Sequence, residues 1–127
     1  MNKVLVVEDN PDMLQLLAWQ VERLGFLVIR AKNGQEGVEK AVKERPILIF
    51  MDIMMPGMDG REAARSLRSK PETREIPIVA ATVLFRDSDL RSCIEAGCND
   101  HLVKPFTFEQ LVGKVQQYTS VPNKYPT

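Results

Sequence analysis

Short apolar runs alternate along the chain with longer segments in which apolar residues recur at helical spacing. The runs cover residues 3–7, 26–29, 47–51, 76–81 and 101–104. They are apolar at successive positions, as are strands that a parallel sheet buries on both faces. The pattern therefore predicts five β-strands.

A helix with clear ends follows the first predicted strand. Asn10 and Pro11 suit its N-cap and first helical position, and Gly25 suits its C-terminal stop. Its apolar face carries Leu14, Leu17, Ala18, Val21 and Leu24.

Four further helical patterns occupy the remaining intervals. Their signatures are, in order, a cap at Asn33, a turn at Asp59-Gly60, an apolar pair at Leu90 and Ile94 with a stop at Gly97, and a capping box of Thr107 and Gln110. Together with the first helix they predict one helix after every strand.

Alternating β and α units with short connections predict a right-handed, doubly wound α/β domain. The simplest arrangement is a flavodoxin-like, five-stranded parallel sheet of order 2-1-3-4-5 flanked by five helices. We expect one domain over residues 1–120. Residues 121–127 contain two prolines and no periodicity, so we interpret them as a tail or the start of a linker.

Composition narrows the classes of partner. The chain has 127 residues, with 17 acidic and 17 basic side chains and no net charge, which argues against nucleic acid or an anionic membrane as its main partner. No apolar run approaches the roughly 20 residues of a membrane span. Cys93 and Cys98 are interpreted as reduced thiols, and nothing ahead of the first strand resembles a signal peptide, so we expect a cytoplasmic protein.

Asp52 directly follows the apolar run 47–51. An ionised carboxylate buried in hydrocarbon costs several kcal/mol, so Asp52 must lie at a strand end that opens to water or to a cation. In open parallel sheets ligands bind beyond the carboxyl ends of the strands, where the order of connections reverses. The other predicted strand ends that carry polar groups are Glu8-Asp9, Thr82 and Lys104-Pro105.

Three carboxylates at this edge would repel one another unless a cation compensated them. Oxygen ligands without His or Cys favour a hard ion, and Mg²⁺ needs only one or two carboxylates, with Mn²⁺ able to substitute. The Lys104 ammonium and the Thr82 hydroxyl could then each contact a phosphoryl oxygen. Asp52 would be the nucleophile that forms an aspartyl phosphate.

Four segments together resemble the receiver domain of two-component response regulators, of the single-domain chemotaxis type. They are VVEDN (6–10), MDIMMPGMDG (51–60), AAT (80–82) and LVKPF (102–106). All stand in family order at the expected strand ends, and the resemblance covers residues 3 to about 118. Such domains are phosphoacceptors in signalling, which catalyse only their own phosphorylation and dephosphorylation.

The resemblance implies a role for each matching residue. Asp52 would accept a phosphoryl group from a histidine of a sensor histidine kinase or a histidine phosphotransfer protein. Glu8, Asp9, Asp52 and the backbone carbonyl of Met54 would hold Mg²⁺. Thr82 matches the switch hydroxyl and Lys104 the phosphate-binding lysine, followed in many relatives by a cis bond to the proline that is Pro105 here.

The sequence departs from the family at two switch positions. His101 stands three residues before the lysine, where relatives often carry Tyr or Phe, and Val83 replaces the usual small residue after the threonine. We hypothesise that His101 takes the switch position; the alternative is a partly exposed strand histidine. The face read by a downstream effector protein or output domain would be the fourth helix, fifth strand and fifth helix, around Arg86, His101, Pro105 and Phe106.

Leu16 and Trp19 fall on the first helix away from its apolar face. One interpretation is a surface that docks the phosphodonor. The other is ordinary exposure of isolated apolar residues.

Three other functions fit the sequence less well. A phosphatase of the haloacid-dehalogenase type needs a second Asp two residues after the nucleophile, where this chain has Met54. A nucleotide- or flavin-binding module would carry a glycine-rich phosphate loop, whereas the first strand-to-helix turn here is acidic. A receiver-like binding module that works without phosphate would not need the full set of acids, hydroxyl and lysine.

Overall fold

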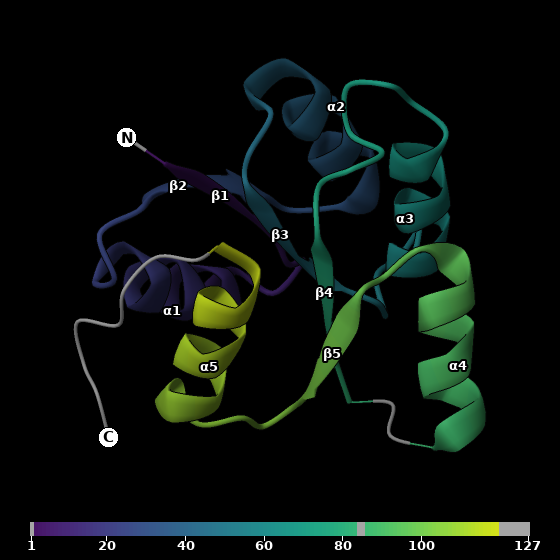
Figure 1. Ribbon diagram of the computed structural model, residues 1–127. Helices are drawn as coiled ribbons and strands as arrows, with labels where there is room; N and C mark the ends of the chain where they lie inside the picture. Colours follow the sequence, from purple (N-terminus) through teal and green to yellow (C-terminus); the bar gives the residue numbers. More distant parts are fainter. Residues whose placement is uncertain (1, 84–85, 120–127) are drawn as a thin grey trace.

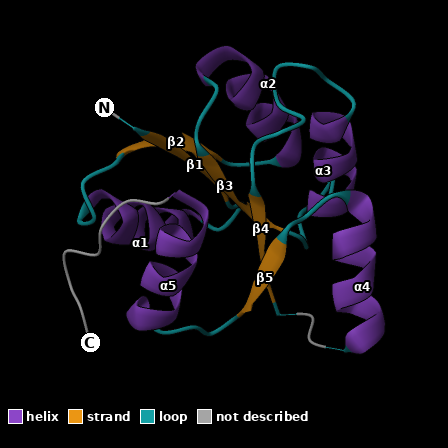
Figure 2. Cartoon of the chain, in the orientation of Figure 1, coloured by secondary structure: helices purple, strands orange, loops and turns teal. Residues whose placement is uncertain are grey.

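The fold is a five-stranded parallel sheet between two layers of helices (Figure 1, Figure 2). The computed structural model describes residues 2–83 and 86–119. The strand order is β2-β1-β3-β4-β5, and every neighbouring pair is parallel. The predicted fold class and strand order are confirmed, while the predicted tail, residues 121–127, lies outside the described residues.

The ten elements alternate along the chain, as the apolar pattern predicts. In order they are β1 (Lys3–Val7), α1 (Pro11–Glu22), β2 (Leu27–Ala31), α2 (Gly34–Glu44), β3 (Leu48–Asp52), α3 (Gly60–Arg68), β4 (Ile78–Thr82), α4 (Asp87–Ala96), β5 (Asp100–Val103) and α5 (Phe108–Thr119).

The helix starts use the capping residues that the sequence indicates. Asn10, Asn33 and Asp59 all accept backbone hydrogen bonds in the first turns of α1, α2 and α3. Thr107 and Gln110 exchange the two bonds of a capping box at the start of α5, at 3.1 and 2.8 Å. Each bond satisfies an N–H group that has no partner within the helix.

The sheet buries an apolar core on each of its faces. Alternate residues of β3 face opposite sides, so that Ile49 and Met51 pack under α2, α3 and α4, while Phe50 packs with Val4 under α1 and α5. All five residues of β3 are buried. The central strands are therefore held on both sides, which fixes the positions of their carboxyl ends. No helix within residues 2–83 and 86–119 is both long and apolar enough to cross a bilayer.

The edge strand β2 and helix α4 depart from the simplest apolar pattern. Leu27 at the start of β2 is exposed, because an edge strand has a neighbour on one side only. In α4 the buried residues are Cys93 and Ala96, whereas Ile94 is 48% exposed and Leu90 is partly exposed. Leu90 and Ile94 mark the helix in the sequence, but they do not form its buried face.

The two cysteines lie inside the protein near the end of α4. Both are free and buried, and burial raises the pKa of the Cys98 thiol to about 12. A buried thiol with a raised pKa is a weak nucleophile. This environment agrees with the predicted reduced thiols.

Candidate functional site

Three carboxylates from two neighbouring strands meet at the carboxyl edge of the sheet. Glu8 and Asp9 follow β1, and Asp52 is the last residue of β3, the strand beside β1. One oxygen from each lies within 4.8 Å of the others. Asp52 is 6% exposed and Glu8 is buried, whereas Asp9 is exposed. The predicted convergence of the acids is confirmed.

The loop after Asp52 folds tightly back onto the end of β3. The Gly60 N–H, at the start of α3, donates to the Ile53 carbonyl at 2.9 Å. A Cβ atom at Gly60 would stand 2.7 Å from Ile53 Cδ1 and would also collide with the Asp52 carbonyl oxygen. Glycine is therefore required where α3 begins, and its absence of a side chain lets the helix start against the phosphoacceptor candidate.

Lys104, the residue after β5, joins the acidic cluster from two strands away from β3. Its Nζ lies 2.6 Å from Glu8 Oε1 and 3.5 Å from Asp52 Oδ1, and its side chain is 15% exposed. The Lys104 N–H donates to the Thr82 carbonyl at 2.8 Å, which places the lysine beside the end of β4. The ammonium thus contacts two acids, and its shorter contact is with Glu8.

The pKa values of the two buried acids, Glu8 and Asp52, are shifted in opposite directions. Burial and, second, the hydrogen bond with Glu8 raise the pKa of Asp52 to about 7, because together they outweigh the attraction of Lys104. Burial also acts to raise the pKa of Glu8, but hydrogen bonds from Lys104 and from the Asn10 N–H outweigh it and hold that pKa below its usual value. Without a cation, Glu8 therefore carries the negative charge, whereas Asp52 is only partly ionised near neutral pH.

The chemistry of the donor set fits a hard divalent ion. The three converging side chains offer carboxylate oxygens only, which suit Mg²⁺ or Mn²⁺. Lys104 supplies one positive charge against three acids, so a divalent cation would balance the cluster. Met54, the predicted source of a carbonyl ligand, follows Asp52 by two residues and is exposed in the loop to α3.

Thr82 closes the edge of the site on the β4 side. It is the buried last residue of β4, one position beyond Ala81, which pairs with Asp52 in the sheet register. After β5 the chain passes through a cis bond between Lys104 and Pro105. Phe106 then packs, partly buried, against the core under α1 and α5.

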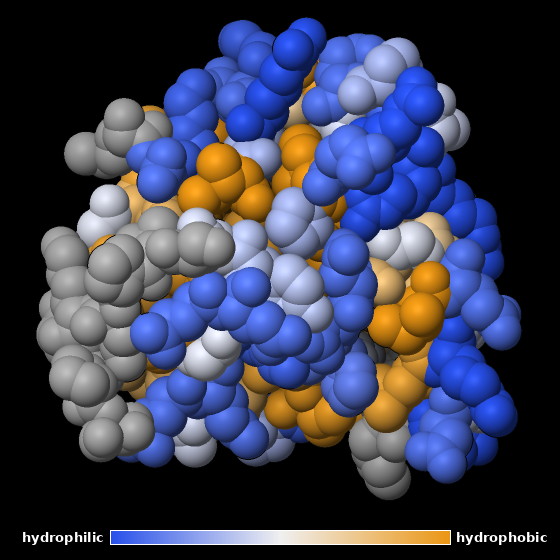
Figure 3. Space-filling model, in the orientation of Figure 1, coloured by the Kyte–Doolittle hydropathy of each residue, from blue (hydrophilic) through white to orange (hydrophobic). Residues whose placement is uncertain are grey.

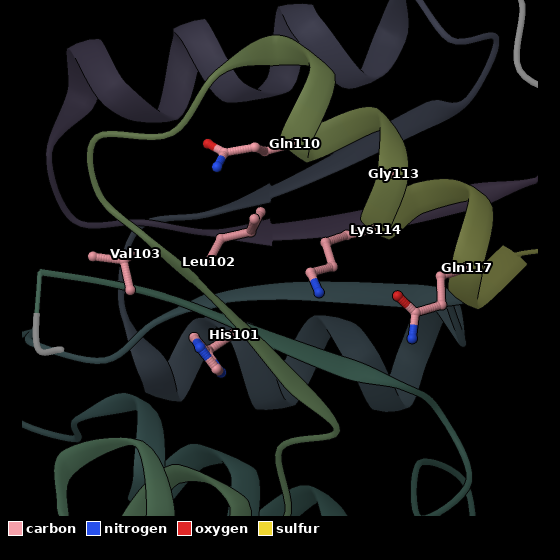
Figure 4. A pocket seen from close by; sticks show the side chains of 7 residues that line it. All are labelled: His101, Leu102, Val103, Gln110, Gly113, Lys114 and Gln117. Atoms are coloured by element: carbon pink, nitrogen blue, oxygen red, sulfur yellow. The ribbon is translucent and has the colours of Figure 1, made fainter. Parts of the chain in front are cut away.

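His101 lies on β5 between α4 and α5. Its side chain is partly exposed, and its Nδ1 is 3.8 Å from Asp100 Oδ1. It lines two grooves, one on each side of β5, and Figure 4 shows its side chain on the side of β5 away from α5. This position agrees with a partly exposed strand histidine and leaves the hypothesis of a switch role open.

Trp19 and Leu16 point outward from α1, as the helical spacing predicts. Trp19 is 54% exposed, and the Arg23 guanidinium lies 4.8 Å from the centre of its ring. Both apolar residues line a cavity of about 550 Å³ whose other lining residues are Asp12, Gln15, Glu22 and Arg30. Trp19 lies about 12 Å along the helix from Pro11, at 1.5 Å per residue, and therefore two turns from the acidic cluster.

Sequence reasoning missed two sets of contacts, one at the site and one at the opposite end of β5. It assigned Lys104 to a phosphoryl oxygen and overlooked the direct ion pair with Glu8. It also missed Asp100, whose Oδ2 accepts hydrogen bonds from Lys114 Nζ at 2.7 Å and from the Tyr118 hydroxyl at 2.9 Å. Lys114 and Tyr118 stand four residues apart on α5, and this spacing was the available signal that both face one partner.

A family model, a curated protein and a solved structure each match most of this chain. A family model described as the response regulator receiver domain matches residues 4–116. Protein PilH of Pseudomonas aeruginosa is 36% identical over 112 residues, which are 88% of this chain and 93% of PilH. The solved structure of chemotaxis protein CheY4 of Vibrio cholerae has a TM-score of 0.88 at 30% identity, covering 93% of this chain and 98% of that one.

A third similar protein has been solved with a bound metal. It is the receiver domain of the sensor histidine kinase PA1611 of Pseudomonas aeruginosa, with a magnesium ion coordinated in its active-site cleft. Its TM-score is 0.86 at 33% identity, and the match covers 92% of this chain and 96% of that one. The fold, the acidic cluster and these matches together show that this chain belongs to the response regulator receiver domain family.

Proposed function

We propose that this receiver takes a phosphoryl group onto Asp52 from a phosphohistidine of a sensor histidine kinase or a histidine phosphotransfer protein. The observation that carries the proposal is the position of Lys104 Nζ, within 4 Å of both Glu8 and Asp52. In the transfer a bond forms between an Asp52 carboxylate oxygen and phosphorus. The bond between the imidazole nitrogen and phosphorus breaks, and its electron pair stays on the nitrogen.

Glu8, Asp9, Asp52 and the Met54 carbonyl are the proposed Mg²⁺ ligands. The bound ion would neutralise negative charge on the transferring phosphoryl group. The three acids support this role because their oxygens converge within 4.8 Å. Asp52 must lose its proton before it can act as a ligand or a nucleophile, since the protonated form lacks the required charge.

Lys104 and Thr82 are the proposed partners of the phosphoryl oxygens. The Lys104 ammonium lies nearer to Glu8 than to Asp52, by 2.6 against 3.5 Å. A phosphoryl group on Asp52 adds about −1.5 to −2 charges, as phosphorylation does on other side chains. We expect this charge to draw the ammonium toward it, while the Thr82 hydroxyl donates to another oxygen.

The proposed readout face comprises α4, β5 and α5, around Arg86, His101, Pro105 and Phe106. Two grooves flank β5 on this face. The groove beside α4 has a volume of about 420 Å³ and includes Leu90 and Ile94, and Figure 3 shows hydrophobic surface on the side of α4 that faces β5. Such apolar residues beside a groove suit contact with a downstream effector protein or output domain.

The second groove runs between β5 and α5 and has a volume of about 500 Å³. Figure 4 shows Gln110, Lys114 and Gln117 along α5, opposite β5. His101 lines both grooves, so a change in its position would alter the whole face. This shared position supports His101 as the switch residue.

Docking of the phosphodonor is proposed for the outer face of α1. Leu16 and Trp19 lie there on the helix that begins directly after the acidic cluster. A partner that binds along this helix would bring its histidine toward Asp52. A cytoplasmic location belongs to the same proposal and is supported by the two free, buried cysteines.

The test is phosphorylation by acetyl phosphate, with and without Mg²⁺, read by intact-mass analysis. Wild type should gain one phosphoryl group only when Mg²⁺ is present, and Asp52→Asn should gain none. Asp12→Asn, which removes a nearby exposed acid outside the cluster, should behave as wild type. An adduct on Asp52→Asn equal to that on wild type would overturn the assignment.

A further inference from the structure

Arg68, the last residue of α3, joins the loop that follows this helix, residues 73–76, to the distant residues 97–99 after α4. Its guanidinium and Nε donate hydrogen bonds to Ile76 O at 2.7 Å, Asn99 Oδ1 at 2.8 Å, Gly97 O at 2.9 Å, Arg74 O at 2.9 Å and Thr73 O at 3.4 Å. All five acceptors are neutral oxygens. The planar guanidinium with its five N–H donors suits such a junction, which a lysine could not reproduce.

The junction holds the C-terminal end of α4. Gly97 ends this helix with a φ of 118°, and a Cβ atom there would lie 2.6 Å from Arg68 Cγ. Gly97 is thus seated directly on the stem of the arginine. The Gly97 and Cys98 N–H groups close the helix end on backbone carbonyls of α4, and the Gly97 carbonyl accepts the Arg68 Nε bond, which ties this closed end to α3.

The same junction reaches the sheet through Asn99. The Asn99 side-chain oxygen accepts from both Arg68 and the Ile78 N–H, the latter at 2.8 Å, and the Asn99 N–H donates to the Ile78 carbonyl at 2.7 Å. Ile78 begins β4. The end of α3, the start of β4 and the end of α4 therefore form one connected unit.

Among the described residues, the N-terminal part of α4 has fewer side-chain hydrogen bonds to neighbouring elements, one of them from the Arg61 guanidinium to Ser92 Oγ at 3.1 Å. The N-cap of α4, Arg86, makes no side-chain capping bond to the first turn. Arg86 instead pairs with Asp89 at 3.3 Å, in an ion pair whose arginine is largely exposed, and exposed ion pairs contribute little to stability. This end follows Thr82 along the chain and therefore lies next to the group proposed to respond to phosphate.

We propose that Arg68 is a positioning residue of the switch, which fixes the C-terminal end of α4 so that phosphorylation moves the N-terminal end of the helix about Gly97. The inference rests on the proposed function of Asp52. Its physical basis is the contrast between a helix end with many hydrogen bonds to rigid neighbours and one without a side-chain cap. The first turn of α4, with Asp87 and Leu90 in the groove beside β5, would change most at the readout face.

The test is amide hydrogen exchange with and without Mg²⁺ and beryllofluoride, a phosphoryl mimic. In wild type, exchange should change at residues 87–91 and stay constant at 94–99. Arg68→Lys keeps the charge but loses most of the hydrogen bonds, so the mimic-induced change should extend through 94–99. Basal exchange there should rise about fivefold or more, as expected for loss of a hydrogen bond. Arg65→Lys, on the exposed side of the same helix, should match wild type.

The outcomes separate the two proposals. If exchange near residues 8–9 and 52–60 responds to the mimic but both ends of α4 change equally in wild type, the role of Arg68 is wrong and the proposed function stands. An Arg68→Lys protein with the wild-type exchange pattern leads to the same conclusion. If no segment of wild type responds, both proposals fail. Where Arg68→Lys does not fold, the wild-type measurement still tests whether the C-terminal end of α4 stays fixed, and equal changes at both helix ends overturn the role of Arg68.

Discussion

At the scale of single residues, the site depends on three acids, Glu8, Asp9 and Asp52, at the carboxyl ends of buried strands. Asp52 ends a fully buried strand, and its neighbour Glu8 takes the nearer contact with Lys104. The protein therefore holds excess negative charge close to one lysine, at a cost that a divalent cation would offset. The sequence predicts which residues meet there. It cannot predict which acid the Lys104 ammonium lies nearer to, because the choice depends on distances that differ by about an ångström, 2.6 against 3.5 Å.

The raised pKa of Asp52 predicts how stability depends on pH. Between its ordinary pKa of 3.8 and about 7, folded Asp52 binds a proton that the unfolded chain releases. Its contribution to stability is therefore full at low pH and is lost as the pH rises through this window. Asp52→Asn removes the effect, so the metal-free variant should be more stable than wild type at pH 8 by on the order of 2 kcal/mol.

Urea unfolding in EDTA, followed by circular dichroism, measures this difference. At pH 4 the variant and wild type should unfold at similar urea concentrations. Asp12→Asn, at an exposed position, should follow wild type at both pH values. Asp52→Asn less stable than wild type at pH 8 would show that the carboxylate is ionised without strain in the folded protein.

At the scale of elements, the apolar pattern and the caps predicted every strand and helix, because both are local signals. Strand ends differ by one or two residues, as at β4, predicted over 76–81 and found over Ile78–Thr82. The apolar pattern did not predict that Ile94 is exposed. The buried residues of α4 are the small Cys93 and Ala96, which contribute little to an apolar periodicity. The junction at Arg68 was also invisible, because its acceptors are mostly backbone carbonyls of any residue type.

Substitution by alanine at two helical glycines, Gly113 and Gly60, should change the stability of the protein in opposite directions. A Cβ atom at Gly113 in α5 would meet nothing within 4 Å, whereas one at Gly60 would collide with Ile53 and with the backbone of Asp52. Gly113→Ala should therefore stabilise the protein by about 0.5–1 kcal/mol through helix propensity. Gly60→Ala should destabilise it by about 1–3 kcal/mol through overpacking. Chemical denaturation of the two variants measures both effects, and equal shifts of the same sign would contradict this account.

At the scale of the whole molecule, the proposed donor surface and readout face belong to different helices. The donor surface is on α1, and the readout face is formed by α4, β5 and α5, of which α4 lies in the opposite helix layer and α5 in the layer of α1. Figure 1 shows α1 and α4 in the two opposite helix layers. This separation would allow a donor to bind without covering the groove beside α4.

The donor surface predicts a selective effect of Trp19→Ala. Phosphotransfer from a histidine kinase or phosphotransfer protein should slow by about tenfold, because exposed tryptophans often dominate binding at interfaces. Phosphorylation by acetyl phosphate, which needs no docking, should be unchanged. Leu27→Ala, at another exposed apolar residue, serves as the control. Equal loss with both phosphodonors would place the defect in the site itself, and no loss with either would exclude the docking role.

The central claim is that Glu8, Asp9, Asp52 and Lys104 form one site for a divalent ion and a phosphoryl group. A crystal structure with Mg²⁺ and beryllofluoride tests it most directly. We expect beryllium bonded to an Asp52 carboxylate oxygen, Lys104 Nζ within hydrogen-bond distance of a fluorine atom, and the ion held by Glu8, Asp9 and Asp52. A structure in which beryllofluoride binds elsewhere, with Lys104 still paired to Glu8 and no ion among the three acids, would contradict it.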